Sequence, residues 1–167
     1  MANRRYRRWL QVRLTRAKSV EVDDEFQFHL TMRARELERQ GYTPERARQE
    51  ALAARIRTAR ATAKQGDIFT AEIRTKFRRL LAPELKGEDG RDAKAVLKED
   101  APSPASIPFK VNAKYPEGAP LPSVPSNLLL SLPTLPEPLE YRIIGKHLVL
   151  LDTAAGIIVD YIPNAIP

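Results

Sequence analysis

Cysteine is absent from the 167 residues of this chain. Its absence excludes a disulfide framework, a thiol nucleophile and any cysteine metal site. Long apolar runs are lacking too, since the best stretches, 148–151 and 154–159, fall far short of the roughly 18 residues that cross a bilayer. We therefore expect no transmembrane segment in this chain.

Recognisable catalytic signatures are equally scarce. The sequence contains no Gly-rich phosphate loop and no nucleophile elbow, and its two histidines, His29 and His147, lack metal-ligand spacing. Asp152 and Asp160 flank the last apolar run and suggest a carboxylate pair, but acids are common at turns and strand ends. We predict that the protein is not an enzyme and has no catalytic residue, cofactor or metal; a hydrolase using these two acids is the weakest alternative.

Positive charge is concentrated at the start of the chain. The net charge is +7, and residues 1–20 contain seven basic residues and no acid, so the remainder is balanced. Arginine interleaved with aromatic side chains attracts nucleic acid, anionic lipid or an acidic protein surface. A solvated tail, or a helix packed on the rest of the chain, explains the same pattern. The predicted partner-binding residues are Arg4, Arg5, Arg7, Arg8 and Trp9.

The same segment bears on the compartment of the protein. Residues 1–20 have a charged beginning but no apolar core behind it, unlike a signal peptide. This favours a cytoplasmic protein that lies peripherally on a membrane, whereas an upstream start that restores a signal peptide would place it in the periplasm.

Helical periodicity dominates residues 21–82. An apolar stripe, Phe26, Leu30, Ala34 and Leu37, predicts a first helix from near Asp23 to Gly41. Thr43 and Pro44 suit the cap and first turn of a second helix, whose small residues Ala47, Ala51, Ala54 and Thr58 favour close helix packing. The pattern predicts a helical hairpin over about 23–62 and a third helix from Ile68 to Leu81, capped by Asp67 and ended by Pro83.

Prolines set the character of residues 83–138. Residues 86–100 are charged and weakly patterned, and the prolines that follow disfavour continuous helix or central strand. Apolar residues punctuate this region, namely Ile107, Phe109, Val111, Tyr115, Leu121 and Val124. They predict an extended strap that covers the protein's own apolar surface, or a ligand for an aromatic groove through Pro133-x-x-Pro136.

Three short β runs follow from residue 139, separated by Gly145-Lys146 and by 152–156. They predict an antiparallel hairpin or meander. The fold class is therefore α+β, in four parts: a basic arm (1–20), a helical domain (21–82), a Pro-rich connector (83–138) and a small β unit (139–167).

Two resemblances add to this interpretation. Residues 22–56 resemble the permease prefix domain of macrolide-exporter-like bacterial permeases, through Asp23-Asp24-Glu25, Phe28-His29-Leu30, Met32-Arg33, Gly41, Thr43-Pro44-Glu45, Ala47-Arg48 and Ala51-Leu52. Residues 132–167 resemble the C-terminal hairpins of small, often exported bacterial proteins. The first implies a cytoplasm-facing docking or regulatory module without transport activity, and the second implies the periplasm.

The leading hypothesis is a non-enzymatic interaction or regulatory module associated with a bacterial membrane transporter. Its partner would be a protein or an anionic membrane surface that contacts the basic arm. The alternative is a nucleic-acid-binding accessory protein that uses the same arm.

Overall fold

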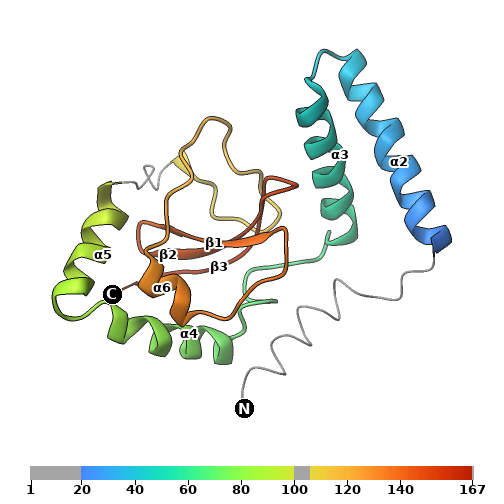
Figure 1. The fold of residues 1–167 in the computed structure, drawn as a ribbon. Coiled ribbons are helices and arrows are strands. Elements are labelled where there is room, and N and C mark those ends of the chain that lie inside the picture. Colours follow the sequence, from blue (N-terminus) through green and yellow to red (C-terminus); the bar gives the residue numbers. More distant parts are fainter. Residues whose placement is uncertain (1–19, 100–105, 167) are drawn as a thin grey trace. The chain divides into compact units, whose positions relative to one another are not determined.

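The computed structural model describes residues 20–99 and 106–166 (Figure 1). These residues form helices and a three-stranded antiparallel sheet, which confirms the α+β class. The chain divides into two compact units, residues 1–52 and 53–167, with the division inside the second helix of the hairpin. The predicted arm, with Arg4, Arg5, Arg7, Arg8 and Trp9, lies outside the described residues.

The first unit contains the predicted hairpin, built from α2 (Val20–Arg39) and the start of α3 (Pro44–Ala59). Gly41 ends the turn with a φ of 97°, a conformation that favours glycine. The Thr43 hydroxyl accepts a hydrogen bond from the Arg46 amide at 3.4 Å, as expected of an N-cap. The interface between the helices is small and rests on Leu30, Ala34, Leu37, Ala47 and Ala51.

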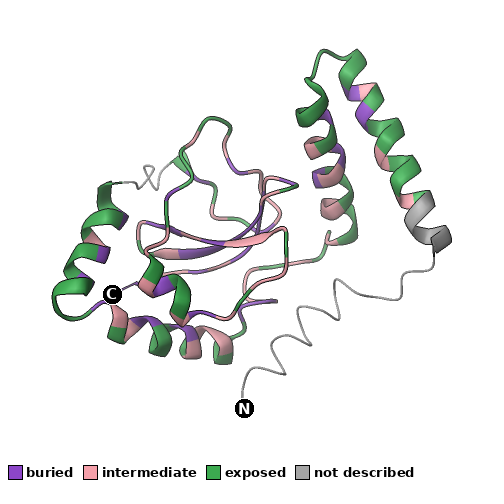
Figure 2. Ribbon diagram, viewed as in Figure 1, coloured by how far each residue is buried: buried purple, intermediate pink, exposed green. Residues whose placement is uncertain are grey.

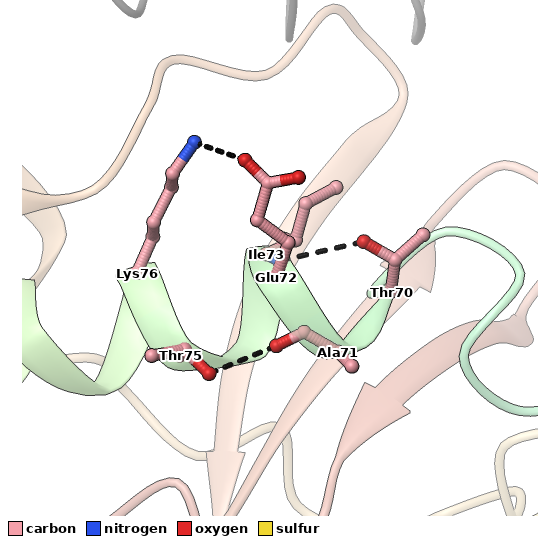
Figure 3. A network of polar contacts seen from close by, with 6 residues as sticks. All are labelled: Thr70, Ala71, Glu72, Ile73, Thr75 and Lys76. Atoms are coloured by element: carbon pink, nitrogen blue, oxygen red, sulfur yellow. Dashed lines mark hydrogen bonds and ion pairs between the residues drawn. The ribbon is translucent and has the colours of Figure 1, made fainter.

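The third predicted helix exists but begins and ends later than expected. It is α4, Ala71–Glu84, capped by the Thr70 hydroxyl, which accepts from the Ile73 amide (Figure 3). Asp67 is not the cap, because its carboxylate accepts from the Lys64 amide instead. The amides of Ile68 and Phe69 donate to Asp160, so the backbone before Thr70 is held outside the helix.

Two helices interrupt the region predicted to be an extended connector. Residues 86–100 have only a weak pattern and fall within the predicted connector, but α5 spans Gly87–Glu99, and α6 covers Ser126–Ser131. Helix α4 also continues through Pro83, which lies in its last turn and leaves one backbone hydrogen bond of the helix unmade. The Glu84 carbonyl at this end accepts from Asn127 Nδ2 at 3.1 Å, which ties α4 to α6.

The C-terminal strands form the predicted meander in the order β1 (Leu139–Ile144), β2 (His147–Asp152) and β3 (Ile157–Ile162). The β2–β3 register shifts between Leu150 and Leu151, so Val159 is an extra residue in β3. Burial is concentrated in these strands (Figure 2).

Both faces of the sheet are covered by other parts of the second unit. On one face, the strap residues Ile107 and Tyr115 form a buried cluster with residues of the strands, and Phe109 packs against it. The strand residues of this cluster are Ile144, Val149, Leu151 and Ile158. On the other face, Phe77 of α4 contacts Tyr141, with ring centroids 5.9 Å apart. The strap therefore covers the protein's own sheet, which is the first of the two roles predicted for it from the sequence.

Candidate functional site

The two edge strands of the sheet, β3 and β1, differ in how far other parts of the chain cover them. Along β3, the Asn112 amide donates to the Ile158 carbonyl at 2.7 Å and the Tyr115 amide donates to the Gly156 carbonyl at 2.8 Å. Arg60 and Gln65 donate from their side chains to the carbonyls of Val159 and Tyr161. The β3 edge is thus closed by the strap and by polar side chains, which prevents further strand pairing there.

The β1 edge is covered only at its start, where the Leu139 amide donates to the Pro136 carbonyl at 2.9 Å. The two-residue turn at Gly145-Lys146 pairs Ile144 with His147, and hydrogen-bonded pairs alternate from such a turn. The main-chain groups of every second residue therefore point away from β2. Within the described part of the chain, no strand pairs with this side. The outward-pointing groups belong to Leu139, Tyr141 and Ile143.

An open apolar groove of about 680 Å³ runs along this edge, and we call it the β1 groove. Its walls are strap residues 121–124, residues 129–130 of α6 and the loop 132–135, and β1 contributes residues 139–142. Leu121 and Leu129 are about half exposed, at 51% and 48%, and Leu130 is 85% exposed. Clustered exposed leucines mark interaction surfaces more often than scattered ones do.

Arg142 lies at the polar end of the β1 groove. Its guanidinium pairs with Glu140 and donates to the Tyr141 carbonyl at 3.0 Å through Nη1. Arg142 Nε is buried and has no hydrogen-bond partner among the described residues. One outward carbonyl of β1 is therefore satisfied only by a side chain of the same strand, and one buried donor is unsatisfied.

Tyr141 fixes the floor of the groove. Its side chain is buried between β1 and α4, and its hydroxyl donates to the Pro133 carbonyl at 3.0 Å. Burial raises the pKa of this hydroxyl well above its ordinary value of 10.0, so the group stays protonated and remains a donor. Ile143, the next outward residue, is fully buried. The part of the β1 edge that lines the groove is Leu139–Arg142.

Comparison with protein families, with characterised proteins and with solved structures found no match. The two resemblances drawn from the sequence stay predictions, and the site has to be interpreted from its own chemistry.

The two acids considered as a catalytic pair each have their own partners. Asp160 is fully buried, and its carboxylate accepts from four backbone amides at 2.8–3.0 Å: those of Gly66, Ile68, Phe69 and Tyr161. Asp152 accepts from the Ala155 amide at 2.9 Å in the β2–β3 turn. Asp160 thus joins β3 to the segment before α4, and Asp152 holds a turn.

The two histidines lie in different compact units. His29 on α2 is exposed and lies 3.7 Å from Glu25. His147 opens β2, with its ring 4.4 Å from that of Phe109, and its Nδ1 accepts from the Asn164 amide at 3.3 Å. Among the described residues, no cluster of three His, Cys, Asp or Glu residues is placed to hold a metal.

We expect stability to fall as the pH drops through His147's titration range. Burial lowers the pKa of His147 below its ordinary value of 6.5, so below that pH the unfolded chain binds the proton more readily than the folded chain. Protonation also removes the acceptor used by the Asn164 amide. The measurement is urea unfolding at several pH values for the wild type and His147→Gln. An identical pH dependence in both proteins would contradict the role of His147.

None of the helices in the described part of the chain is long and apolar enough to cross a membrane. The β1 groove was not predicted from the sequence. Its leucines and prolines were visible as a strap, but nothing local in the sequence indicates which sheet edge the strap leaves open.

Proposed function

We propose that this protein is a non-enzymatic interaction module, and that the β1 groove binds an extended peptide segment of its partner. The observation that carries the proposal is the pairing of an open strand edge with a leucine-lined groove beside it. An extended peptide that adds to a sheet edge gains affinity from main-chain hydrogen bonds and specificity from pockets for alternate side chains.

The chemistry of the groove defines the peptide. Its walls are mostly leucine, proline and valine, with Ser123 and Thr134 among them, so most side chains that point into it should be apolar. On the outward side of β1, the Leu139 amide already donates to Pro136 and the Tyr141 carbonyl already accepts from Arg142. The Leu139 carbonyl and the Tyr141 amide are therefore the groups that would pair with a peptide in extended conformation. The resemblance of residues 22–56 to the permease prefix domain supports a membrane transporter as the protein that carries this peptide.

The test is selection from a displayed library of random short peptides on the full-length protein. We expect enrichment of extended apolar peptides, and we expect Leu121→Asp and Leu130→Asp each to weaken their binding by about tenfold or more, because burial of one leucine contributes roughly 1.5–3 kcal/mol. Val96→Asp is the matched control, since Val96 is an exposed apolar residue on α5 outside the groove.

A second measurement tests the main-chain contacts. N-methylation at alternate residues of a selected peptide should abolish binding in one register and leave it unchanged in the other, because only every second residue of a paired strand faces β1. Selected peptides that bind the Leu121→Asp and Leu130→Asp variants as tightly as the wild type would refute the groove as the binding site.

A further inference from the structure

Helix α2 carries apolar side chains on two opposite faces. Leu30, Ala34 and Leu37 face α3. Because successive residues of an α-helix are rotated by about 100°, Phe28 and Met32 project from the opposite side of α2. Phe28 is 61% exposed and Met32 is 45% exposed, although both are large apolar residues. A helix with two apolar faces is normally covered on both.

The first unit supplies little of its own to cover the second face. The cluster between α2 and α3 consists of two leucines and three alanines, which is a small core for a two-helix unit. The outer side of both helices is exposed (Figure 2). A second chain packed on this side would bury apolar surface that the hairpin alone leaves exposed.

The charges on the exposed face are arranged symmetrically around Met32. Glu25 lies seven residues before Met32 and Arg39 lies seven residues after it, so both are two turns away on the same face. Both side chains are well exposed, at 74% for Glu25 and 72% for Arg39. Their present partners are close neighbours on the same helix, His29 for Glu25 and Glu36 for Arg39.

We propose that this face of α2 binds a second copy of the chain, with the two α2 helices antiparallel about a two-fold axis at Met32. The axis places Met32 against Met32 of the second copy and brings each Glu25 to Arg39 of the other copy. The same axis lays Phe28 along the stem and guanidinium of Arg35 from the second copy, a favourable cation–π arrangement. A two-fold interface requires a self-complementary surface, and the acid–apolar–base order of this face is self-complementary.

The charges on this face of α2 favour a second, antiparallel copy of the chain over an apolar partner in general. A parallel arrangement of two α2 helices would bring Glu25 to Glu25 and Arg39 to Arg39, and like charges disfavour it. The antiparallel arrangement pairs opposite charges twice in each dimer, once at either end of the apolar centre.

The experiment is sedimentation velocity on the full-length chain over a range of concentrations at low salt. We expect the wild type to form a dimer of twice 18.9 kDa and Met32→Glu to be monomeric, because it sets two acids against each other at the axis. Met32 is exposed and outside the core of the hairpin, so circular dichroism should show unchanged helix content.

Charge reversal tests the arrangement itself. Glu25→Arg and Arg39→Glu should each raise the dimer dissociation constant by about tenfold, since each replaces two attractive pairs by two repulsive ones. The combined variant Glu25→Arg/Arg39→Glu should restore wild-type association. Loss of a favourable contact within one helix would not be repaired by the exchange.

The control is Leu130→Asp, which alters the β1 groove and should leave the dimer intact while weakening peptide binding. A wild-type chain that stays monomeric, or a dimer that persists in Met32→Glu, would overturn the proposal and leave the β1 groove unaffected. Failure of the combined charge variant to restore association would overturn the antiparallel arrangement.

Discussion

Replacement of Asp160 by asparagine is expected to lower the free energy of unfolding by about 3–5 kcal/mol. The carboxylate is fully buried and accepts four backbone N–H groups, two on each oxygen. Asparagine keeps one acceptor oxygen but sets its NH2 group against two amide donors. Those two amides then lose their acceptor at a buried or half-buried position, and each such group costs about 1–3 kcal/mol.

Asp152→Asn is the matched control for this prediction. Asp152 is also nearly buried, but its carboxylate accepts one amide, that of Ala155. An asparagine oxygen can accept the same bond, so the expected loss is below about 1 kcal/mol. Urea unfolding followed by circular dichroism measures both variants. Equal losses in the two variants would show that the four-amide arrangement at Asp160 is not a major source of stability.

The role of Asp160 shows where inference from sequence ends. Its place after an apolar run is visible in the sequence, but three of its four amide partners belong to a segment more than ninety residues earlier. Long-range partners of this kind leave no local pattern. The same contacts explain why the third helix begins at Ala71 rather than at Ile68, since the Ile68 and Phe69 amides are already engaged.

The sequence correctly predicted the turns and hairpins that depend only on residues close together in the chain. Thr43, Pro44 and Gly41 set the hairpin turn, and alternation with Gly145-Lys146 set the β1–β2 hairpin. Helix α5 escaped prediction because its charged sequence begins with Gly87 and has another glycine at Gly90, which weakens any helical signal. It buries Ala93 and Leu97, so tertiary packing outweighs its low propensity.

The difference between the sheet edges is the feature of the fold that bears most on function. A short strap segment around Asn112 pairs with β3 and closes that edge. The strap then continues past the sheet and forms one wall of the β1 groove at residues 121–124. The strap therefore covers the β3 edge and forms a wall of the groove beside the β1 edge. This arrangement supports the proposal that the β1 edge pairs with a strand of a partner.

Replacement of Phe77 by alanine should strongly destabilise the core of the second unit. Its ring packs edge-on against Phe69 at 5.3 Å and against Tyr141 at 5.9 Å, so it joins α4 to the face of the sheet opposite the strap. Truncation of a buried phenylalanine removes apolar contacts and leaves a cavity, at a cost of about 3–5 kcal/mol.

Leu80→Ala supplies the comparison on the same helix. Leu80 is 42% exposed, so its truncation removes little buried surface and should cost less than about 1 kcal/mol. Phenylalanine is a poorer helix former than leucine, so its replacement by alanine gains more helix propensity, and propensity cannot explain a larger loss for Phe77→Ala. Chemical unfolding should show a large loss for Phe77→Ala only. Because the Tyr141 ring forms part of the same contact and lines the β1 groove, Phe77→Ala should also weaken peptide binding there, whereas Leu80→Ala should not.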